Sequence, residues 1–338
     1  MSLTAMHPWQ YACLVLVPPV TALILYRLWK KYATKRMGLR HQHFVITGGS
    51  SGIGRAMALL IVRRGGNVTI VARNKERLED VKLELLDAAQ SPEQAMHIIS
   101  ADLAGDFESL VREVRDAEDC CGPIDYLVNC AGSAVSQRFE ETPLDDFEKM
   151  IRVNYLSAVQ ATRAVLPGMK QRNRGSVTFV SSIAGVLGMY GFTAYCPAKF
   201  ALLGFAEALR MEVKHHGIDI TVCFPPDTDT PGFAEEQKSK PIETKLICGA
   251  AGLSSAESVA LSMLDDILER NFAATVGFDG RFILTLCAGM MPFNSWLDLM
   301  VQVLSMGFLR LVGVFYLGRF YSVVASCASK REGSKKSA

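Results

Sequence analysis

The stretch Thr47-Gly48-Gly49-Ser50-Ser51-Gly52-Ile53-Gly54 decides the fold of this chain. It directly follows the apolar run His43-Phe44-Val45-Ile46 and precedes residues 55–61, which are mostly apolar. This order predicts a short strand, a tight turn and then a helix. The free N–H groups at the start of such a helix point at an anion, so the pattern favours a phosphate-binding turn.

The three glycines of this turn have separate expected roles. Gly48 permits the sharp turn, Gly52 lets the backbone approach a pyrophosphate, and Gly54 lets the helix pack closely on the sheet. The spacing GxxxGxG differs from the commoner GxGxxG, and a glycine-rich turn without a ligand is the alternative interpretation. The expected cofactor contacts of the turn are Gly48, Ser50, Ser51, Gly52, Ile53 and Gly54.

The next predicted strand, residues 67–72, ends at Arg73, and Arg77 follows one turn into the next predicted helix. An acidic residue at this place would hydrogen-bond the 2′-hydroxyl of NAD, whereas arginine accommodates the 2′-phosphate of NADP. We therefore expect NADPH as the cofactor. The alternative is that Arg73 is a solvated charge at the end of a strand.

Two further predicted strands end in polar residues. Residues 100–103 end a third strand, where Asp102, next to Leu103, is placed to accept a hydrogen bond from an adenine amine. Residues 125–132 end a fourth strand at Asn129. Because the carboxyl ends of parallel strands lie at one edge of a sheet, we expect Asp102, Leu103 and Asn129 to border the nucleotide.

Three residues downstream form a candidate catalytic set. Ser182 precedes Tyr195 by thirteen residues, and Lys199 follows the tyrosine by four. On a helix, residues i and i+4 share a face, so an ammonium would lie beside a phenol whose ordinary pKa is about 10. That pairing can make the tyrosine an acid or base. Proline at position 197 is tolerated in a first helical turn, which predicts that Tyr195 begins the helix.

The order of these motifs, with Val153-Asn154-Tyr155 and Pro225 at a later strand end, resembles the short-chain dehydrogenase/reductase family over about residues 40–275. The resemblance implies an α/β fold, a doubly wound parallel sheet of about seven strands with helices on both faces. It also implies the roles of the catalytic residues. Ser182, or alternatively Ser181, polarises a carbonyl, Tyr195 donates a proton, Lys199 supports the tyrosine and holds the nicotinamide ribose, and Asn154 anchors a water.

Within the family, the run Phe224–Glu236, which contains PPDTDTPGF, and the segment Gly188–Ala194 are similar to enzymes of sphingolipid synthesis. This resemblance implies NADPH-dependent reduction of 3-oxosphinganine to sphinganine. Apolar residues around 186–192 and 232–234 are candidates for lining a lipid channel. Four acidic residues are candidates for pairing with a substrate ammonium, although acidic loops are more often solvated: Asp227, Asp229, Glu235 and Glu236. A microsomal steroid or retinoid reductase and a non-catalytic nucleotide-binding scaffold are the alternatives.

Composition excludes several other classes. A chain of 338 residues with 49% hydrophobic side chains can bury a large α/β core, leaving around 90 residues for attachments. The net charge of +2 and the absence of a basic stripe argue against nucleic-acid binding. Nine cysteines without a CxxC pair indicate reduced thiols, and we expect neither a metal site nor a disulfide framework. Family members often pair through long helices, so a homodimer is an open expectation.

The N-terminal residues 1–30 are the first expected attachment. Residues 8–26 are long and apolar enough to cross a bilayer, and six basic residues follow between positions 27 and 40. Under the positive-inside rule, the reductase domain, residues 40–275, then faces the cytosol. A cleaved signal peptide is disfavoured because no positive charge precedes the run. Pro18-Pro19 keeps a bent or hairpin insertion open.

The second expected attachment is the apolar region of residues 280–329. Gly289, Pro292, Asn294 and Arg310 interrupt it, so the sequence favours a re-entrant or interfacial membrane element over one straight helix. A core extension or a dimer-facing helix pair is the alternative. The basic tail, residues 330–338, ends Lys335-Lys336-Ser337-Ala338, which resembles a retrieval signal of endoplasmic-reticulum membrane proteins. We expect that membrane to be the location.

Overall fold

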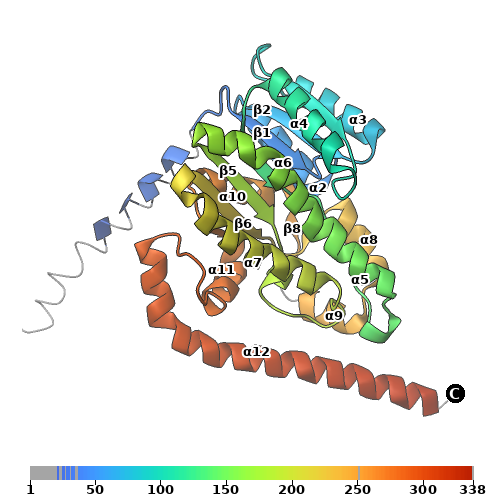
Figure 1. Ribbon diagram of the computed structural model, residues 1–338. Helices are drawn as coiled ribbons and strands as arrows, with labels where there is room; N and C mark the ends of the chain where they lie inside the picture. Colours follow the sequence, from blue (N-terminus) through green and yellow to red (C-terminus); the bar gives the residue numbers. More distant parts are fainter. Residues whose placement is uncertain are drawn as a thin grey trace, which may run out of the picture.

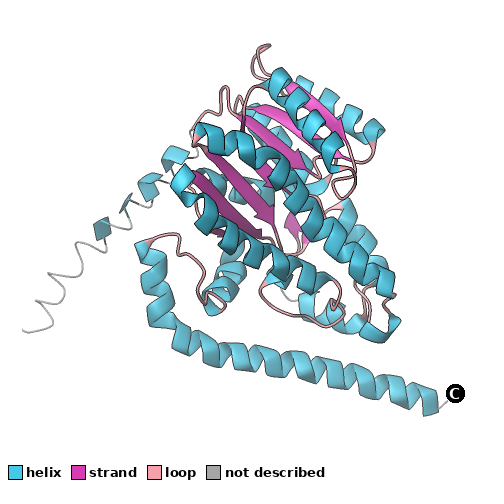
Figure 2. Cartoon of the chain, viewed as in Figure 1, coloured by secondary structure: helices cyan, strands magenta, loops and turns pink. Residues whose placement is uncertain are grey.

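The computed structural model describes residues 37–249 and 252–336, together with 21, 22, 25, 26, 28–30 and 32–34. Its centre is a seven-stranded sheet with a layer of helices on each face (Figures 1 and 2). The predicted bilayer-crossing segment 8–26 lies almost entirely outside the described residues. The eight cysteines within them are all free thiols.

All strand pairs of the large sheet are parallel, in the order β3-β2-β1-β4-β5-β6-β9. The order confirms the doubly wound sheet of about seven strands that the motifs predict. The strands are β1 (His43–Thr47), β2 (Asn67–Ala72), β3 (Met96–Ser100), β4 (Ile124–Asn129), β5 (Gly175–Val180), β6 (Ile218–Phe224) and β9 (Ala273–Thr275), and a separate short pair joins β7 (Thr228–Asp229) to β8 (Ser254–Ser255).

Alternation along the strands divides the interior into two apolar cores. In β1, Phe44 and Ile46 belong to one core and Val45 to the other, because successive side chains point to opposite faces. The first core packs under α2 (Gly52–Arg63), α3 (Lys75–Asp87) and α10 (Ala256–Leu268). The second packs under α4 (Phe107–Cys121), α6 (Ser157–Arg172) and α7 (Tyr195–Val213). Both faces of the sheet are therefore covered, as parallel sheets require.

The strand order reverses between β1 and β4, which opens a crevice at their carboxyl ends. Thr47 pairs in register with Val71 on one side and with Asn129 on the other. Its hydroxyl accepts hydrogen bonds from the backbone N–H groups of Cys130 and Ala131, each at 3.0 Å. The glycine turn after β1 and the loop after β4 are thus tied together at the edge where doubly wound folds bind ligands.

Shorter elements surround this edge. They are α5 (Leu144–Ile151), the π-helical turn η3 (Arg152–Leu156), α8 (Pro231–Ser239), α9 (Ile242–Cys248) and two 3₁₀ turns, η2 (Phe139–Glu141) and η4 (Ile183–Gly185). A further 3₁₀ turn, η5 (Lys214–His216), lies at the opposite edge, just before β6. Segments far apart in the chain therefore meet around one crevice.

The C-terminal region consists of α11 (Gly277–Leu286) and the 41-residue α12 (Trp296–Lys336). Gly289, Pro292 and Asn294 lie between the two helices, where the sequence predicts a break. Arg310, an expected interruption of the apolar region, lies inside α12 and does not end the helix. Arginine is a good helix former, and on an exposed helix its charge stays in contact with solvent.

Candidate active site

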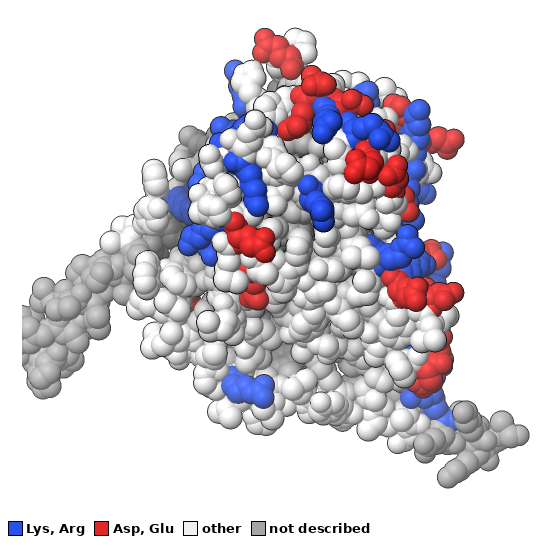
Figure 3. Space-filling model, in the orientation of Figure 1, with Lys and Arg blue, Asp and Glu red and all other residues white. Residues whose placement is uncertain are grey.

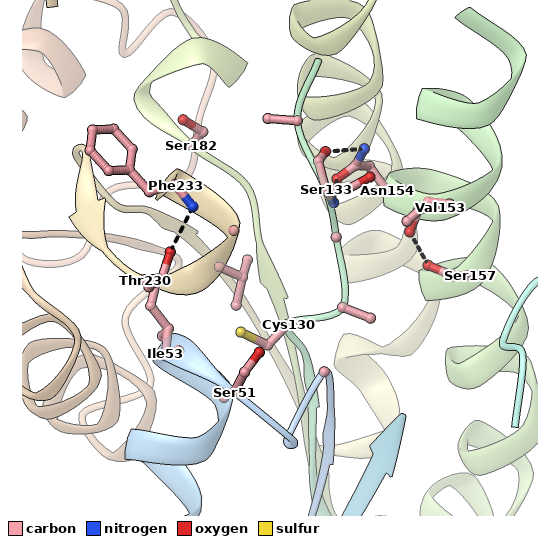
Figure 4. A pocket seen from close by; sticks show the side chains of 18 of the residues that line it. Ser51, Ile53, Cys130, Ser133, Val153, Asn154, Ser157, Ser182, Thr230 and Phe233 are labelled. Atoms are coloured by element: carbon pink, nitrogen blue, oxygen red, sulfur yellow. Dashed lines mark hydrogen bonds between the residues drawn. The ribbon is translucent and has the colours of Figure 1, made fainter. Parts of the chain in front are cut away.

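A cleft of about 910 Å³ runs along the carboxyl edge of the sheet, from the glycine turn to the start of α7. All the residues of the turn predicted to contact a cofactor line it, and so do Ser182, Tyr195, Lys199 and Asn154. Figure 4 shows Ser51 and Ile53 at one end of the cleft, with Ser182 and Asn154 on separate segments farther along. The fold thus brings residues from distant parts of the chain into one cavity.

The glycine turn has no room for side chains. Gly48 has φ +69°, and a Cβ on it would lie 2.9 Å from the Ala131 backbone. A Cβ on Gly54 would lie 2.4 Å from the Gly48 carbonyl oxygen, and Gly52 has φ +53°. The α2 helix therefore starts directly against the turn, and its first N–H groups are left to face an anion. This cradle fits the pyrophosphate of a dinucleotide.

One end of the cleft is where the sequence predicts the adenosine of the cofactor. All but one of the residues predicted to contact it line the cleft there. Arg73 and Arg77 are exposed and line the cleft together with Asp102 and Leu103. Asn129 is buried instead, does not line the cleft, and donates a hydrogen bond from Nδ2 to the Thr162 hydroxyl at 3.2 Å. The next three residues, Cys130, Ala131 and Gly132, form the cleft wall at this level.

The Ser182 hydroxyl lies close enough to the Tyr195 phenol to lower the pKa of the phenol. Tyr195 is the first residue of α7, and Pro197 lies within the first turn, where its missing N–H leaves no bond unmade. The neighbouring Ser181 hydroxyl donates to the Lys199 carbonyl at 2.9 Å and is buried, so Ser182 is the serine that faces the tyrosine. Burial raises the pKa of the Tyr195 phenol, and the Glu236 carboxylate raises it further.

Lys199 lies one turn after the tyrosine on the same face of α7. Its Nζ is 5.6 Å from the centre of the Tyr195 ring and donates to the Val180 carbonyl at 3.0 Å. Burial lowers the pKa of Lys199 to about 8, although the nearby Cys130 opposes the shift. The lysine therefore still carries a proton at neutral pH, and the tyrosine keeps its own.

Asn154 lies in η3, between α5 and α6, and is held by the loop after β4. Its Oδ1 accepts from the Ser133 N–H at 3.2 Å, and its Nδ2 donates to the Ser133 carbonyl at 2.9 Å (Figure 4). Gly132 keeps open the space between Asn154 and Lys199. A Cβ on this glycine would lie 2.7 Å from Asn154 Oδ1 and 3.3 Å from Lys199 Nζ.

The opposite wall of the cleft contains a charged cluster that sequence reasoning found only in part. Asp227 and Glu236 line the cleft, and the Lys240 ammonium lies 3.4 Å from the Asp227 carboxylate and 2.9 Å from that of Glu236. The Lys240 side chain is 1% exposed. The Glu236–Lys240 spacing of four residues was the signal available in the sequence. Of the other two acidic candidates, Asp229 is exposed outside the cleft. Glu235 lines the cleft and forms an exposed pair with Lys238.

Only some of the residues expected to line a lipid channel border the cleft. Met189, Phe192, Gly232 and Phe233 line the cleft. Val186 packs into one of the apolar cores instead, and it is not part of the cleft lining.

Comparison with known proteins agrees with this architecture. Residues 42–241 match the family model described as short chain dehydrogenase. This chain belongs to the short-chain dehydrogenase family. It is an oxidoreductase, and its fold indicates a nicotinamide nucleotide as the cofactor. The motif order in the sequence, from the glycine turn to Lys199, predicts this membership and is confirmed.

Relatives within the short-chain dehydrogenase family are similar over nearly the whole chain. The 3-dehydrosphinganine reductase of Danio rerio is 45% identical over 93% of this chain and 94% of its own. The 3-ketodihydrosphingosine reductase of Mus musculus is 42% identical over 90% of this chain and 92% of its own. A solved structure, levodione reductase, superimposes with a TM-score of 0.63 over 70% of this chain and 95% of its own, at 23% identity. That likeness concerns the fold alone.

Proposed function

We propose that this protein reduces 3-oxosphinganine to sphinganine with NADPH. The observation that carries the reduction is the placement of Ser182, Tyr195 and Lys199 together, in the same cleft as the glycine turn. The substrate class rests on relatives that are named for this reaction and match more than 90% of their own length. An apolar section of the cleft, with Met189, Phe192 and Phe233, suits a long-chain ketone.

The residues of the cleft can complete the reduction as follows. The substrate carbonyl oxygen accepts hydrogen bonds from the Ser182 and Tyr195 hydroxyls, which polarise it. The glycine turn and Arg73 would hold NADPH, which would supply the hydride for the carbonyl carbon. Tyr195 then gives its proton to the oxygen, so the ketone becomes an alcohol and the phenol becomes a phenolate. The raised pKa of Tyr195 keeps this proton available at neutral pH.

Lys199 and Asn154 restore the tyrosine. The Lys199 ammonium favours the phenolate electrostatically while it exists. The space above Gly132 joins Lys199 Nζ to Asn154 Oδ1, and a water held there would pass a proton back towards the tyrosine. Asn154 acts in this scheme through its position, which the two hydrogen bonds to Ser133 hold.

NADPH is preferred over NADH because of the charges at the end of β2. Arg73 and Arg77 offer two guanidinium groups at the cleft rim, and guanidinium groups bind phosphate strongly. No acidic side chain among the described residues 72–75 competes for a ribose hydroxyl at this strand end. Replacing both arginines by alanine should therefore raise KM for NADPH much more than KM for NADH.

We place the protein on the endoplasmic-reticulum membrane, with the catalytic domain in the cytosol. By length and composition, α12 is apolar enough to cross a membrane, because an 18-residue stretch between Trp296 and Arg331 has a mean hydropathy of 1.7. It is nevertheless held against the domain: Gly313 packs on Leu286 of α11. Charged side chains gather around α3 and α4 and are sparse over α11 and α12 (Figure 3). An interfacial α12 is the arrangement we favour.

The substrate assignment is tested by NADPH oxidation in microsomes that contain the protein. We expect turnover with 3-oxosphinganine and little with a ketosteroid or retinal. Activity confined to the steroid or to retinal would overturn the proposed substrate while leaving the reductase mechanism in place.

A further inference from the structure

The charged cluster on the cleft wall has an excess of negative charge. Two carboxylates, Asp227 and Glu236, share the single ammonium of Lys240 at 3.4 and 2.9 Å. The side chain of Glu236 is only 11% exposed, and that of Lys240 is 1% exposed. Buried charges are usually balanced one to one, because an uncompensated charge is costly to desolvate. With two carboxylates and one ammonium, the cluster therefore has a net negative charge, which favours the binding of one more cation.

This cluster adjoins the reaction centre. The Phe192 ring is 5.5 Å from the Tyr195 ring on one side and 5.5 Å from Lys240 Nζ on the other. The Phe233 ring lies 5.1 Å from the same ammonium, so the lysine is enclosed by aromatic rings while its two carboxylate partners reach the cleft. Both carboxylates act on the Tyr195 phenol and raise its pKa.

We propose that Glu236, assisted by Asp227, binds the ammonium group of an α-amino ketone and so determines the specificity of the reduction. This inference rests on the proposed function, because in 3-oxosphinganine the carbon next to the ketone carries a primary ammonium. With the carbonyl oxygen at Ser182 and Tyr195, that ammonium lies beside the reacting carbon, towards the wall that the carboxylates form. A charge-assisted hydrogen bond from ammonium to carboxylate then orients the ketone.

Lys240 has a positioning role in this arrangement. It is the C-cap residue of α8, four positions after Glu236, and it joins that helix to the loop containing Asp227. Its ammonium holds both carboxylates at the cleft wall. The substrate cation adds to this pairing and does not need to displace the lysine.

The test compares two ketones that differ only in the amino group, 3-oxosphinganine and 1-hydroxyoctadecan-3-one, with the full-length protein in membranes. For Glu236→Gln we expect kcat/KM for the amino ketone to fall roughly 10- to 100-fold, as for loss of a hydrogen bond between charged groups. The value for the uncharged ketone should fall much less, because for that substrate only the effect of Glu236 on the Tyr195 phenol is lost. Asp227→Asn should give a smaller loss of the same kind.

Asp229→Asn is the matched control, because it removes one negative charge from the same segment at an exposed position outside the cleft. It should leave both values unchanged. Equal losses for the two ketones in Glu236→Gln would show a purely structural role and overturn the proposal, and so would no loss for either. A parent enzyme that reduces neither ketone would instead refute the proposed function itself.

Discussion

At the scale of single residues, the reaction depends on the phenol of Tyr195. Its hydroxyl lies near that of Ser182, and its ring centre lies 5.6 Å from Lys199 Nζ. Tyr195→Phe removes only the oxygen, so we expect kcat to fall at least about 100-fold while NADPH binding, measured by fluorescence, stays near the parent value. Undiminished turnover in this variant would refute the assigned proton donor.

Gly132 offers a second test, because its missing side chain leaves space that the mechanism uses. In Gly132→Ala the new Cβ would approach Asn154 Oδ1 to 2.7 Å and Lys199 Nζ to 3.3 Å. We expect kcat to fall roughly 10- to 100-fold, since misplacing catalytic groups by a fraction of an ångström is costly. Gly204→Ala is the control, since a Cβ there meets nothing within 4 Å. Equal kinetics in the two variants would contradict the proton path.

His43, at the start of β1, makes the stability of the folded protein depend on pH. Its Nδ1 donates to the Gly122 carbonyl at 2.6 Å, so its Nε2 is the unprotonated nitrogen that accepts from Thr69 at 2.8 Å. Burial lowers the pKa of His43 from 6.5 to about 4. As the pH falls from about 6.5 to 4, the unfolded chain takes up a proton that the folded chain refuses. The folded state therefore loses stability across this window.

Because of this histidine, we expect the free energy of unfolding to fall by about 2 kcal/mol between pH 7 and pH 5. Urea unfolding at the two pH values measures the loss. In His43→Gln, which does not titrate there, the difference between the two pH values should shrink by about that amount. A variant with the same pH dependence as the parent would show that other groups cause the acid sensitivity.

At the scale of elements, α12 is joined to α9 by an ion pair. Arg331 near the end of α12 pairs with Glu243, whose side chain is 0% exposed. Burial alone would raise the pKa of Glu243, but the hydrogen bond from Arg331 and other contacts lower it overall. In the same region, the Thr244 hydroxyl donates to the Tyr190 carbonyl at 2.8 Å, which ties α9 to the segment before Tyr195.

Removing the arginine should therefore destabilise the protein through the carboxylate it leaves behind. We expect Arg331→Ala to lower Tm by roughly 5 °C, and Glu243→Gln added to it to recover most of that loss, because an amide needs no counter-ion. Arg319→Ala, at an exposed position of the same helix, is the control. A double variant no more stable than Arg331→Ala would argue against the ion pair.

Local patterns predict the elements that build the cofactor end of the site. The glycine turn, Arg73 and Asp102 follow strands whose apolar runs are visible in the sequence. Because the strands pair in parallel, these residues lie at the same edge of the sheet. Contacts between distant segments are not visible in this way. Lys240 looks like a surface lysine until Phe192 and Phe233 enclose it, and Asn129 turns towards Thr162 because of how α6 packs. Arg310 likewise does not end α12, because its side chain is exposed to solvent, and the sequence alone does not show which side of the helix faces solvent.

At the scale of the whole molecule, the domain presents one apolar surface beyond its core. Leu304 and Phe315 of α12 are 80% and 78% exposed, although α12 is also anchored to α11 and α9. A helix held against a domain at two places presents its outward face as a unit. This arrangement favours a helix that lies in the membrane interface and keeps the cleft near the lipid.

We therefore expect that a chain lacking residues 1–20, and with them most of the N-terminal apolar run, still floats with lipid vesicles. Changing both Leu304 and Phe315 to Glu should lower the bound fraction roughly tenfold or more, because each loses the free energy of burying a large apolar side chain. The control changes Leu83 and Leu144 to Glu, which are equally exposed on α3 and α5. If the two double variants bind vesicles equally well, α12 is not the membrane-contacting surface.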